Sequence, residues 1–164
     1  MSLFQNIIII MLLIAGAGFL SLSEIALAAA RKVKLKILAE SGEIRAQKVL
    51  DLQEQSADFF AASQIGLNAV AILGGILGEA AFRPFFVELI VQSYRGPWLE
   101  TIGFALSFTM VTTLFILFAD LMPKRLAMIA PEKIAISVIE PIQIFIRICK
   151  PLAWGINAIA NVLF

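Results

Sequence analysis

Residues 3–30, LFQNIIIIMLLIAGAGFLSLSEIALAAA, decide the fold because Glu24 is their only charged residue. The stretch exceeds the roughly 20 residues that cross the hydrocarbon core of a bilayer. A segment in lipid must satisfy its own backbone polar groups, so we expect a membrane-spanning helix. Arg31 and Lys32 follow the apolar run, and no basic region precedes it, so it does not fit a signal peptide.

Two further runs, residues 59–78 and 101–119, contain no charged residue. The sequence therefore predicts an all-α integral membrane domain over residues 1–164, with three transmembrane helices at about residues 3–30, 57–80 and 100–122. Juxtamembrane helices are expected at residues 31–55 and 131–164. The first should be a hairpin broken near Ser41 and Gly42. The second should consist of short pieces, each opened or broken by a proline: Pro131, Pro141 and Pro151. Residues 134–149 are expected along the membrane interface, and residues 151–164 have the composition to re-enter it in part.

The composition excludes several classes of function. Hydrophobic residues make up 60% and charged residues 15% of the 164 residues, which is too little charge to cover a water-exposed surface. A net charge of +1 gives no reason to expect a nucleic-acid partner. The chain has no histidine, a single cysteine, and neither a phosphate-binding glycine loop nor a Ser/His/Asp set. We expect no enzyme and no cofactor beyond a bound Mg²⁺ or Na⁺ held by oxygen ligands.

The basic residues predict the orientation. All of them except Arg83 and Arg95 lie in the segments that follow the first and third spans. Because positive charge gathers on the cytoplasmic side, these segments should be cytoplasmic, with the N-terminus and the loop at residues 80–100 outside. The expected location is the inner membrane of a bacterium.

Ionisable residues inside spans are rare and usually functional. Glu79 is the exception here, because Arg83 four residues later offers an ion pair. Glu24 lies about two turns from the inner end of the first span. Asp120 ends the third span, where it has either a functional role or an ion pair with Lys124.

Polar neighbours accompany these acids on all three spans. Ser21 shares a helical face with Glu24, and Ser23 lies in the same turn, while Gln64 and Asn68 share a face of the second span. Hydroxyls in membrane helices often bond to their own helix, and amides often join neighbouring helices. Taken together, the placement of these groups on separate spans predicts one polar cavity for cations.

Two helix features complete the prediction. Pro123 cannot donate to the carbonyl four residues back, so a helix break there would leave the Ala119 oxygen free beside Asp120. Gly74 and Gly78 match the small-xxx-small pattern. That pattern fits either packing within the chain, which we favour, or a dimer contact.

The motifs Ser21-Leu22-Ser23-Glu24, Gln64-Ile65-Gly66-Leu67-Asn68 and Asp120-Leu121-Met122-Pro123-Lys124, with Pro131-Glu132 after them, resemble the membrane domain of the CorC/CNNM magnesium and cobalt transport family. The resemblance implies a dimer of three-span domains with a cation site between the spans. It implies that Gly66 joins the site and that Ser21, Ser23, Asn68 and Asp120 are metal ligands. It also implies that a CBS pair and a C-terminal domain follow in the full-length protein, which fits the apolar end of this chain at Phe164.

The chain departs from the family pattern in the second span. The family has Gly-Asn-x-x-x-Asn there, whereas Leu67 and Ala71 stand at the two asparagine positions. A magnesium cage would lack two amide oxygens. The chain is most similar to a bacterial inner-membrane branch that has been linked to export of putrescine and cadaverine.

Three functions remain open at this stage. The first is a transporter that exports divalent cations through an oxygen-lined site. The second is an exporter of organic polycations, in which separated acids bind the two ammonium groups and apolar residues line the middle. The third is a dimerising membrane anchor that senses ions without transporting them.

Overall fold

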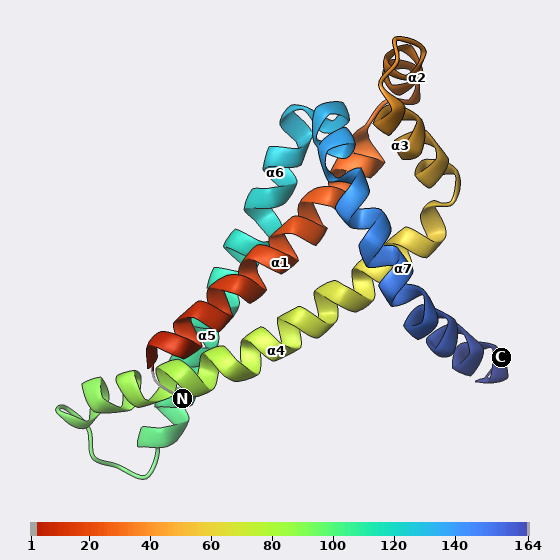
Figure 1. Ribbon diagram of the computed structural model, residues 1–164. Coiled ribbons are helices and arrows are strands. Elements are labelled where there is room, and N and C mark those ends of the chain that lie inside the picture. Colours follow the sequence, from red (N-terminus) through yellow and green to blue (C-terminus); the bar gives the residue numbers. More distant parts are fainter. Residues whose placement is uncertain (1–2, 164) are drawn as a thin grey trace. The chain divides into compact units, whose positions relative to one another are not determined.

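The computed structural model describes the backbone of residues 3–163 and the side-chain surroundings of residues 4–149 and of Pro151. Over residues 3–163 helix is the only regular secondary structure, which confirms the all-α prediction (Figure 1). Three helical stretches are long and apolar enough to cross a membrane: Phe4–Ala29, Ser56–Val91 and Leu99–Ile129. They belong to α1 (Leu3–Ala29), to α4 (Ser56–Val91), and to the consecutive helices α5 (Leu99–Leu114), η1 (Phe115–Leu121) and α6 (Met122–Ile129).

The second helix is longer than predicted, because α4 continues eleven residues past residue 80, to Val91. Pro84 lies inside it. Proline removes one backbone hydrogen bond and bends a helix without ending it when neighbouring turns are held. Here Arg83 bonds the buried carboxylate of Glu79 one turn earlier, and its guanidinium lies 5.4 Å from the centre of the Phe104 ring. The predicted Glu79–Arg83 pair is confirmed.

The third apolar stretch changes its helical register before Pro123. Residues 115–121 form a π-helix, in which the N–H of Met122 bonds to the carbonyl of Leu117, five residues back. The chain then continues as α6 instead of breaking at Pro123. In a π-helix each carbonyl accepts a hydrogen bond from the N–H five residues later instead of four. The carbonyl four residues before a proline therefore still has a donor, although the proline nitrogen has no hydrogen.

Two short helices follow α1, as the sequence predicted. Helix α2 spans Lys32–Glu40 and α3 spans Ile44–Glu54. Gly42 turns the chain between them with a φ of +100°, a conformation that other residues rarely adopt. Helix α3 packs on α2 and on α7, which spans Pro131–Leu163 (Figure 1).

Helix α7 corrects the expectation of several short helices after residue 130. Pro131 opens it, as expected, but the helix continues through Pro141 and Pro151. The residues around Pro141 explain this, because Ile139 and Ile142 are fully buried and Val138 is nearly so. Burial of these side chains outweighs the single hydrogen bond lost at Pro141. The side chains of residues 152–164, where partial re-entry was considered, lie outside the described residues.

The chain divides into two compact units. One contains residues 1–18 and 68–122, and the other contains residues 19–67 and 123–164. The second unit has a core where the end of α1 meets the short helices. Its buried residues are Ala26, Ala30, Leu35, Ala46, Val49, Leu50, Ala127, Ala135, Ile136 and Ile139. In the first unit, Gly74 and Gly78 of α4 lie against Phe115 and Val111, which supports packing within the chain.

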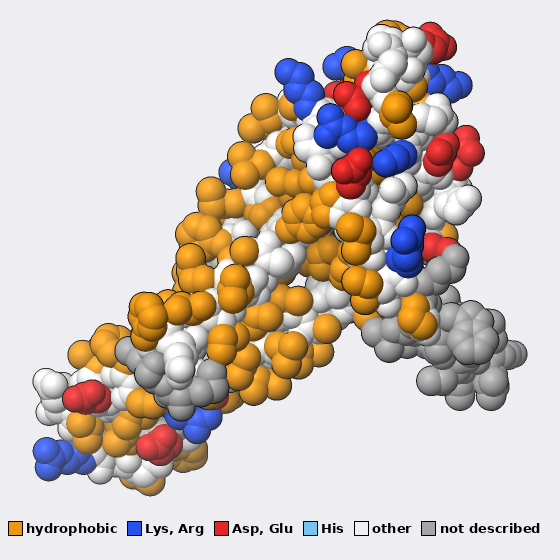
Figure 2. All heavy atoms as spheres, in the orientation of Figure 1, with side chains coloured by type: hydrophobic (Ala, Val, Ile, Leu, Met, Phe, Trp, Pro, Cys, Tyr) orange, Lys and Arg blue, Asp and Glu red, His pale blue; other side chains and the backbone are white. Residues whose placement is uncertain are grey.

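Charge and apolar surface are segregated along the chain. Lysine, arginine and acidic side chains gather over α2, α3 and the start of α7, and a smaller charged group lies near the C-terminal end of α4, whereas apolar side chains cover most of the long helices (Figure 2). Exposed large side chains such as Met11, Ile72, Ile76 and Phe118 are at least 46% accessible. In water such a surface would aggregate, so lipid is its expected surrounding.

Gln53 of α3 caps the end of α1. Its amide nitrogen donates to the carbonyls of Leu27 at 2.7 Å and Ala30 at 2.9 Å, which have no donors further along their own helix. We expect Gln53→Ala to lower the free energy of unfolding by about 1–3 kcal/mol, because it leaves these carbonyls unpaired. Chemical denaturation of detergent-solubilised protein measures this change. Gln47→Ala on the same helix is the control, since Gln47 bonds only the exposed Asp51; an equal loss in both variants would refute the capping role.

Candidate functional site

Two helices bring a carboxylate and an amide together in the membrane region of the second unit. Glu24 lies on α1 and Gln64 lies on α4. The amide nitrogen of Gln64 donates a hydrogen bond to Oε1 of Glu24 at 3.2 Å. The Glu24 side chain is partly buried, and the Gln64 side chain is exposed. A neutral amide orients the carboxylate without cancelling its charge. Glu24 therefore remains an acceptor for a cation, and so does the oxygen of Gln64.

Three serines near this pair are fully buried: Ser21, Ser23 and Ser63. The Ser23 hydroxyl donates to the carbonyl of Phe19 at 2.7 Å, the bond to its own helix that such residues often make. Ser63 directly precedes Gln64, and its hydroxyl has no hydrogen-bond partner within the described residues. Ser63 was not among the residues predicted for the site, although its position beside Gln64 in a membrane span was a signal for it.

Gly66 has a packing role in the second unit. A Cβ at this position would lie 2.9 Å from both Leu20 of α1 and Phe145 of α7. The missing side chain lets α4 approach both helices closely. Its neighbour Leu67 packs against the cluster formed by Leu20, Leu27, Phe59, Val138 and Ile142. The surroundings of Gly66 are therefore apolar, and its assignment to a cation site rests on the family resemblance alone.

The remaining predicted site residues belong to the first unit. Asn68 is exposed, Ala119 is buried and Asp120 is partly buried within η1. The hydroxyl of Thr113 donates to the carbonyl of Thr109 at 2.8 Å. The structure thus joins Glu24 with Gln64. The expectation that Asn68, Ala119 and Asp120 take part in the same site stays a prediction from the sequence.

A second charged cluster surrounds Glu132 at the start of α7. Glu132 is 7% exposed as a whole residue, and its two carboxylate oxygens lie 3.1 Å from Arg31 Nε and 3.6 Å from Lys34 Nζ. Burial raises the pKa of Glu132, but the hydrogen bond from Arg31, the backbone N–H and the two positive charges outweigh it. The net result is a pKa below the ordinary value of 4.5.

This lowered pKa predicts a pH dependence of stability. The ionised carboxylate stabilises the fold at pH above 4.5, and the contribution disappears as the pH falls through the lower pKa of the folded state. We expect Glu132→Gln to cost about 1 kcal/mol at pH 7, since Arg31 and Lys34 are themselves largely exposed. Thermal unfolding of both proteins between pH 3 and pH 8 measures the difference. If the difference in stability between the wild type and Glu132→Gln became larger at acidic pH, the stabilising role of the ionised Glu132 carboxylate would be contradicted.

The acidic residues do not form a cluster typical of a metal centre. Within the described residues, no three side chains from His, Cys, Asp and Glu come close enough to hold a metal ion. At Glu24 the structure shows one carboxylate in contact with one neutral amide, that of Gln64.

Comparison with known proteins places this architecture. Residues 8–164 match the model of the cyclin M transmembrane N-terminal domain, CNNM. The chain belongs to the CNNM family. This CNNM domain is 51% identical over 160 residues to the polyamine export protein of Escherichia coli K12, covering 98% of this chain and 36% of that protein. It is 44% identical to the polyamine export protein of Haemophilus influenzae over 164 residues, covering 100% of this chain and 38% of that protein.

More distant relatives share the same region. A UPF0053 protein of Synechocystis is 32% identical over 150 residues, which cover 88% of this chain and 33% of that protein. The CNNM domain thus spans about a third of the length of the curated relatives it matches. Its three long helices and its similarity to bacterial export proteins identify a membrane protein of bacterial type.

Proposed function

We propose that this CNNM domain is the membrane part of an exporter of small aliphatic polyamines, and that Glu24 binds an ammonium group of the substrate. The observation that carries the proposal is the carboxylate of Glu24, held on a membrane helix by the neutral amide of Gln64. Relatives that share 44–53% of its residues over nearly its whole length are named polyamine export proteins.

The chemistry of this pair suits a primary ammonium. Such a group has three N–H donors, and the oxygens of Glu24 and Gln64 accept two or more of them. Leu67 lies one turn from Gln64 on the same side of α4, and the part of its side chain that does not pack against the Leu20 cluster would offer apolar surface to a methylene chain. Bonds to a charged acceptor contribute about 1.5–3 kcal/mol each, enough for micromolar to millimolar binding when several act together.

A divalent cation such as Mg²⁺ is the second candidate, supported by the family match. In that case Ser21, Ser23, Asn68 and Asp120 would add oxygens to the site. Leu67 and Ala71 stand where the family has asparagines, so two amide ligands are missing. Mg²⁺ demands near-octahedral oxygen coordination, which favours the polyamine.

The distribution of charge supports an orientation. We place α2, α3 and the start of α7 in the cytoplasm, because eleven of the thirteen basic residues lie at residues 31–48 and 124–150, in or beside these helices. The N-terminus and the loop after α4 then lie outside the inner membrane. A homodimer, and cytoplasmic CBS and C-terminal domains in the full-length protein, complete the proposed assembly.

Transport by the full-length protein in liposomes tests the function. Liposomes that contain the protein and are loaded with labelled putrescine should release it faster than loaded liposomes without protein. Added cadaverine should compete with putrescine for the same site. Butylamine, which has one ammonium group, should compete poorly. Release of Mg²⁺ without release of putrescine would establish the second candidate instead, and no release of either ion would favour the anchor or sensor.

A further inference from the structure

A groove of about 410 Å³ lies where α2 meets the junction of α6 and α7, and it is separate from the Glu24–Gln64 pair. All of its lining residues belong to the second unit. They are Lys34, Ile37, Leu38, Ile129, Ala130, Glu132 and Lys133. The groove thus combines two ammonium groups and one carboxylate with apolar side chains.

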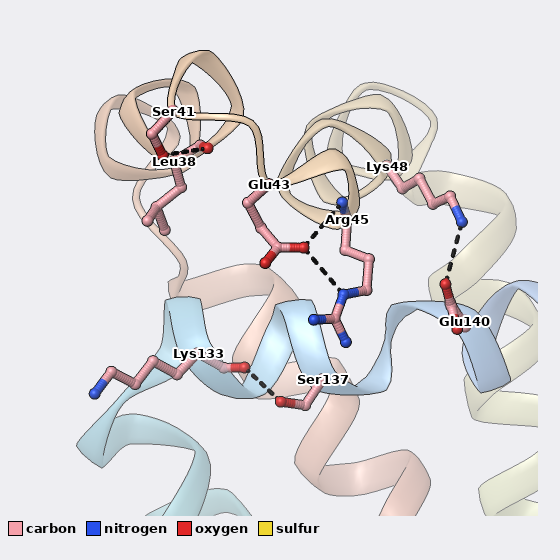
Figure 3. Close-up of polar contacts among 8 residues, drawn as sticks. All are labelled: Leu38, Ser41, Glu43, Arg45, Lys48, Lys133, Ser137 and Glu140. Carbon is pink, nitrogen blue, oxygen red and sulfur yellow. Dashed lines mark hydrogen bonds and ion pairs between the residues drawn. The ribbon is translucent and has the colours of Figure 1, made fainter.

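The charge balance of the groove is positive. Its one carboxylate, Glu132, already pairs with Lys34 and with Arg31, which is not among the residues that line the groove. Lys133 forms no ion pair within residues 4–149. Figure 3 shows the Lys133 ammonium extending away from Glu43 and Glu140, which pair with Arg45 and Lys48 respectively. An anion in the groove would meet uncompensated positive charge.

The apolar rim of the groove is exposed. Ile37 is 60% and Ile129 is 78% accessible, and Met128 beside Ile129 is 61% accessible. Ile129 ends the third long apolar stretch and lies four residues after the basic pair Lys124 and Arg125, so the groove is expected at the membrane interface. Exposed isoleucines at that level are expected to contact acyl chains, while the lysines reach the headgroup region.

We propose that this groove binds an anionic phospholipid, with the headgroup phosphate on Lys34 and Lys133 and the acyl chains over Ile37 and Ile129. Three observations select this occupant: excess positive charge, an exposed apolar rim, and a position at the end of a membrane span. Basic pockets at this level of membrane proteins take acidic headgroups. The lipid would tie the α2–α3 hairpin to the membrane surface independently of any transported cation.

Native mass spectrometry of the full-length protein with phosphatidylglycerol or phosphatidylcholine tests the proposal. We expect the wild type to retain phosphatidylglycerol preferentially. Lys34→Gln/Lys133→Gln should weaken that retention roughly tenfold or more, since each lysine at an anionic surface contributes about a fivefold gain. Lys36→Gln is the matched control, because Lys36 is exposed on α2 but does not line the groove. Lys34→Arg/Lys133→Arg should restore binding, which shows that loss in the glutamine variant reflects charge and not misfolding.

The other outcomes overturn the proposal. Equal retention of the two lipids, or equal loss in Lys36→Gln and in the double variant, would show that general surface charge accounts for binding. Displacement of the lipid by inorganic phosphate alone would indicate a site for free anions. If neither the wild type nor the variants retain phosphatidylglycerol, the groove does not bind an anionic phospholipid.

Discussion

Replacing Glu24 by glutamine is expected to lower putrescine export roughly 10- to 100-fold, while the protein stays folded. The substitution keeps the shape of the side chain and its contact with Gln64. It removes the negative charge, which contributes about 1.5–3 kcal/mol to a hydrogen bond with a charged partner. Initial rates of putrescine release from liposomes containing the full-length protein measure the change.

The control for this prediction is another acid on the same unit. Glu40→Gln removes a charge at the exposed end of α2 and should leave the export rate within about twofold of wild type. Asp120→Asn in the same assay tests the sequence-based expectation that Asp120 contributes to binding. Export by Glu24→Gln at the wild-type rate would remove Glu24 from the mechanism.

The second large effect is expected on α4 of the first unit, where neighbouring glycines differ in their surroundings. A Cβ at Gly78 would lie 2.5 Å from Val111 Cγ1, and one at Gly74 would lie closer still to the Phe115 ring. We expect Gly74→Leu to cost about 3 kcal/mol of unfolding free energy, because it forces α4 away from η1. Thermal unfolding in detergent measures the loss.

Gly75 is the matched control for this substitution. Nothing lies within 4 Å of a Cβ built there, although it is the next residue in the same helix. Gly75→Leu should be neutral or slightly stabilising, since glycine is about 0.8–1 kcal/mol less favourable in a helix than alanine and leucine ranks just below alanine. Equal destabilisation by both variants would mean that the effect comes from the loss of glycine itself and not from packing.

Elements governed by local chemistry could be predicted from the sequence. The apolar runs predicted three membrane helices, and the Ser41-Gly42 pair predicted the turn between α2 and α3. The prolines were harder to interpret. Pro141 was expected to end a helix, but burial of Ile139 and Ile142 keeps α7 continuous. Whether a proline ends a helix depends on contacts with other helices, which a local pattern does not contain.

In the candidate site too, local sequence patterns predicted some features, whereas contacts between helices were not predictable. Polar faces on separate spans predicted that Glu24 and Gln64 belong together, and the structure brings them into contact. The sequence did not reveal that Gly66 would meet Leu20 and Phe145. It also did not reveal that the hydroxyl of Ser63 would be buried without a partner in the described part of the chain. Helical periodicity assigns residues to faces, whereas the identity of the facing residues depends on the packing angle between helices.

Calorimetric titration shows whether Glu24 binds an ammonium group of a polyamine. Putrescine and Mg²⁺ are titrated calorimetrically into the purified full-length protein, into Glu24→Gln and into Glu40→Gln. We expect saturable putrescine binding to the wild type and to Glu40→Gln, with at least roughly tenfold weaker binding to Glu24→Gln. Putrescine binding of equal strength in all three proteins would contradict it.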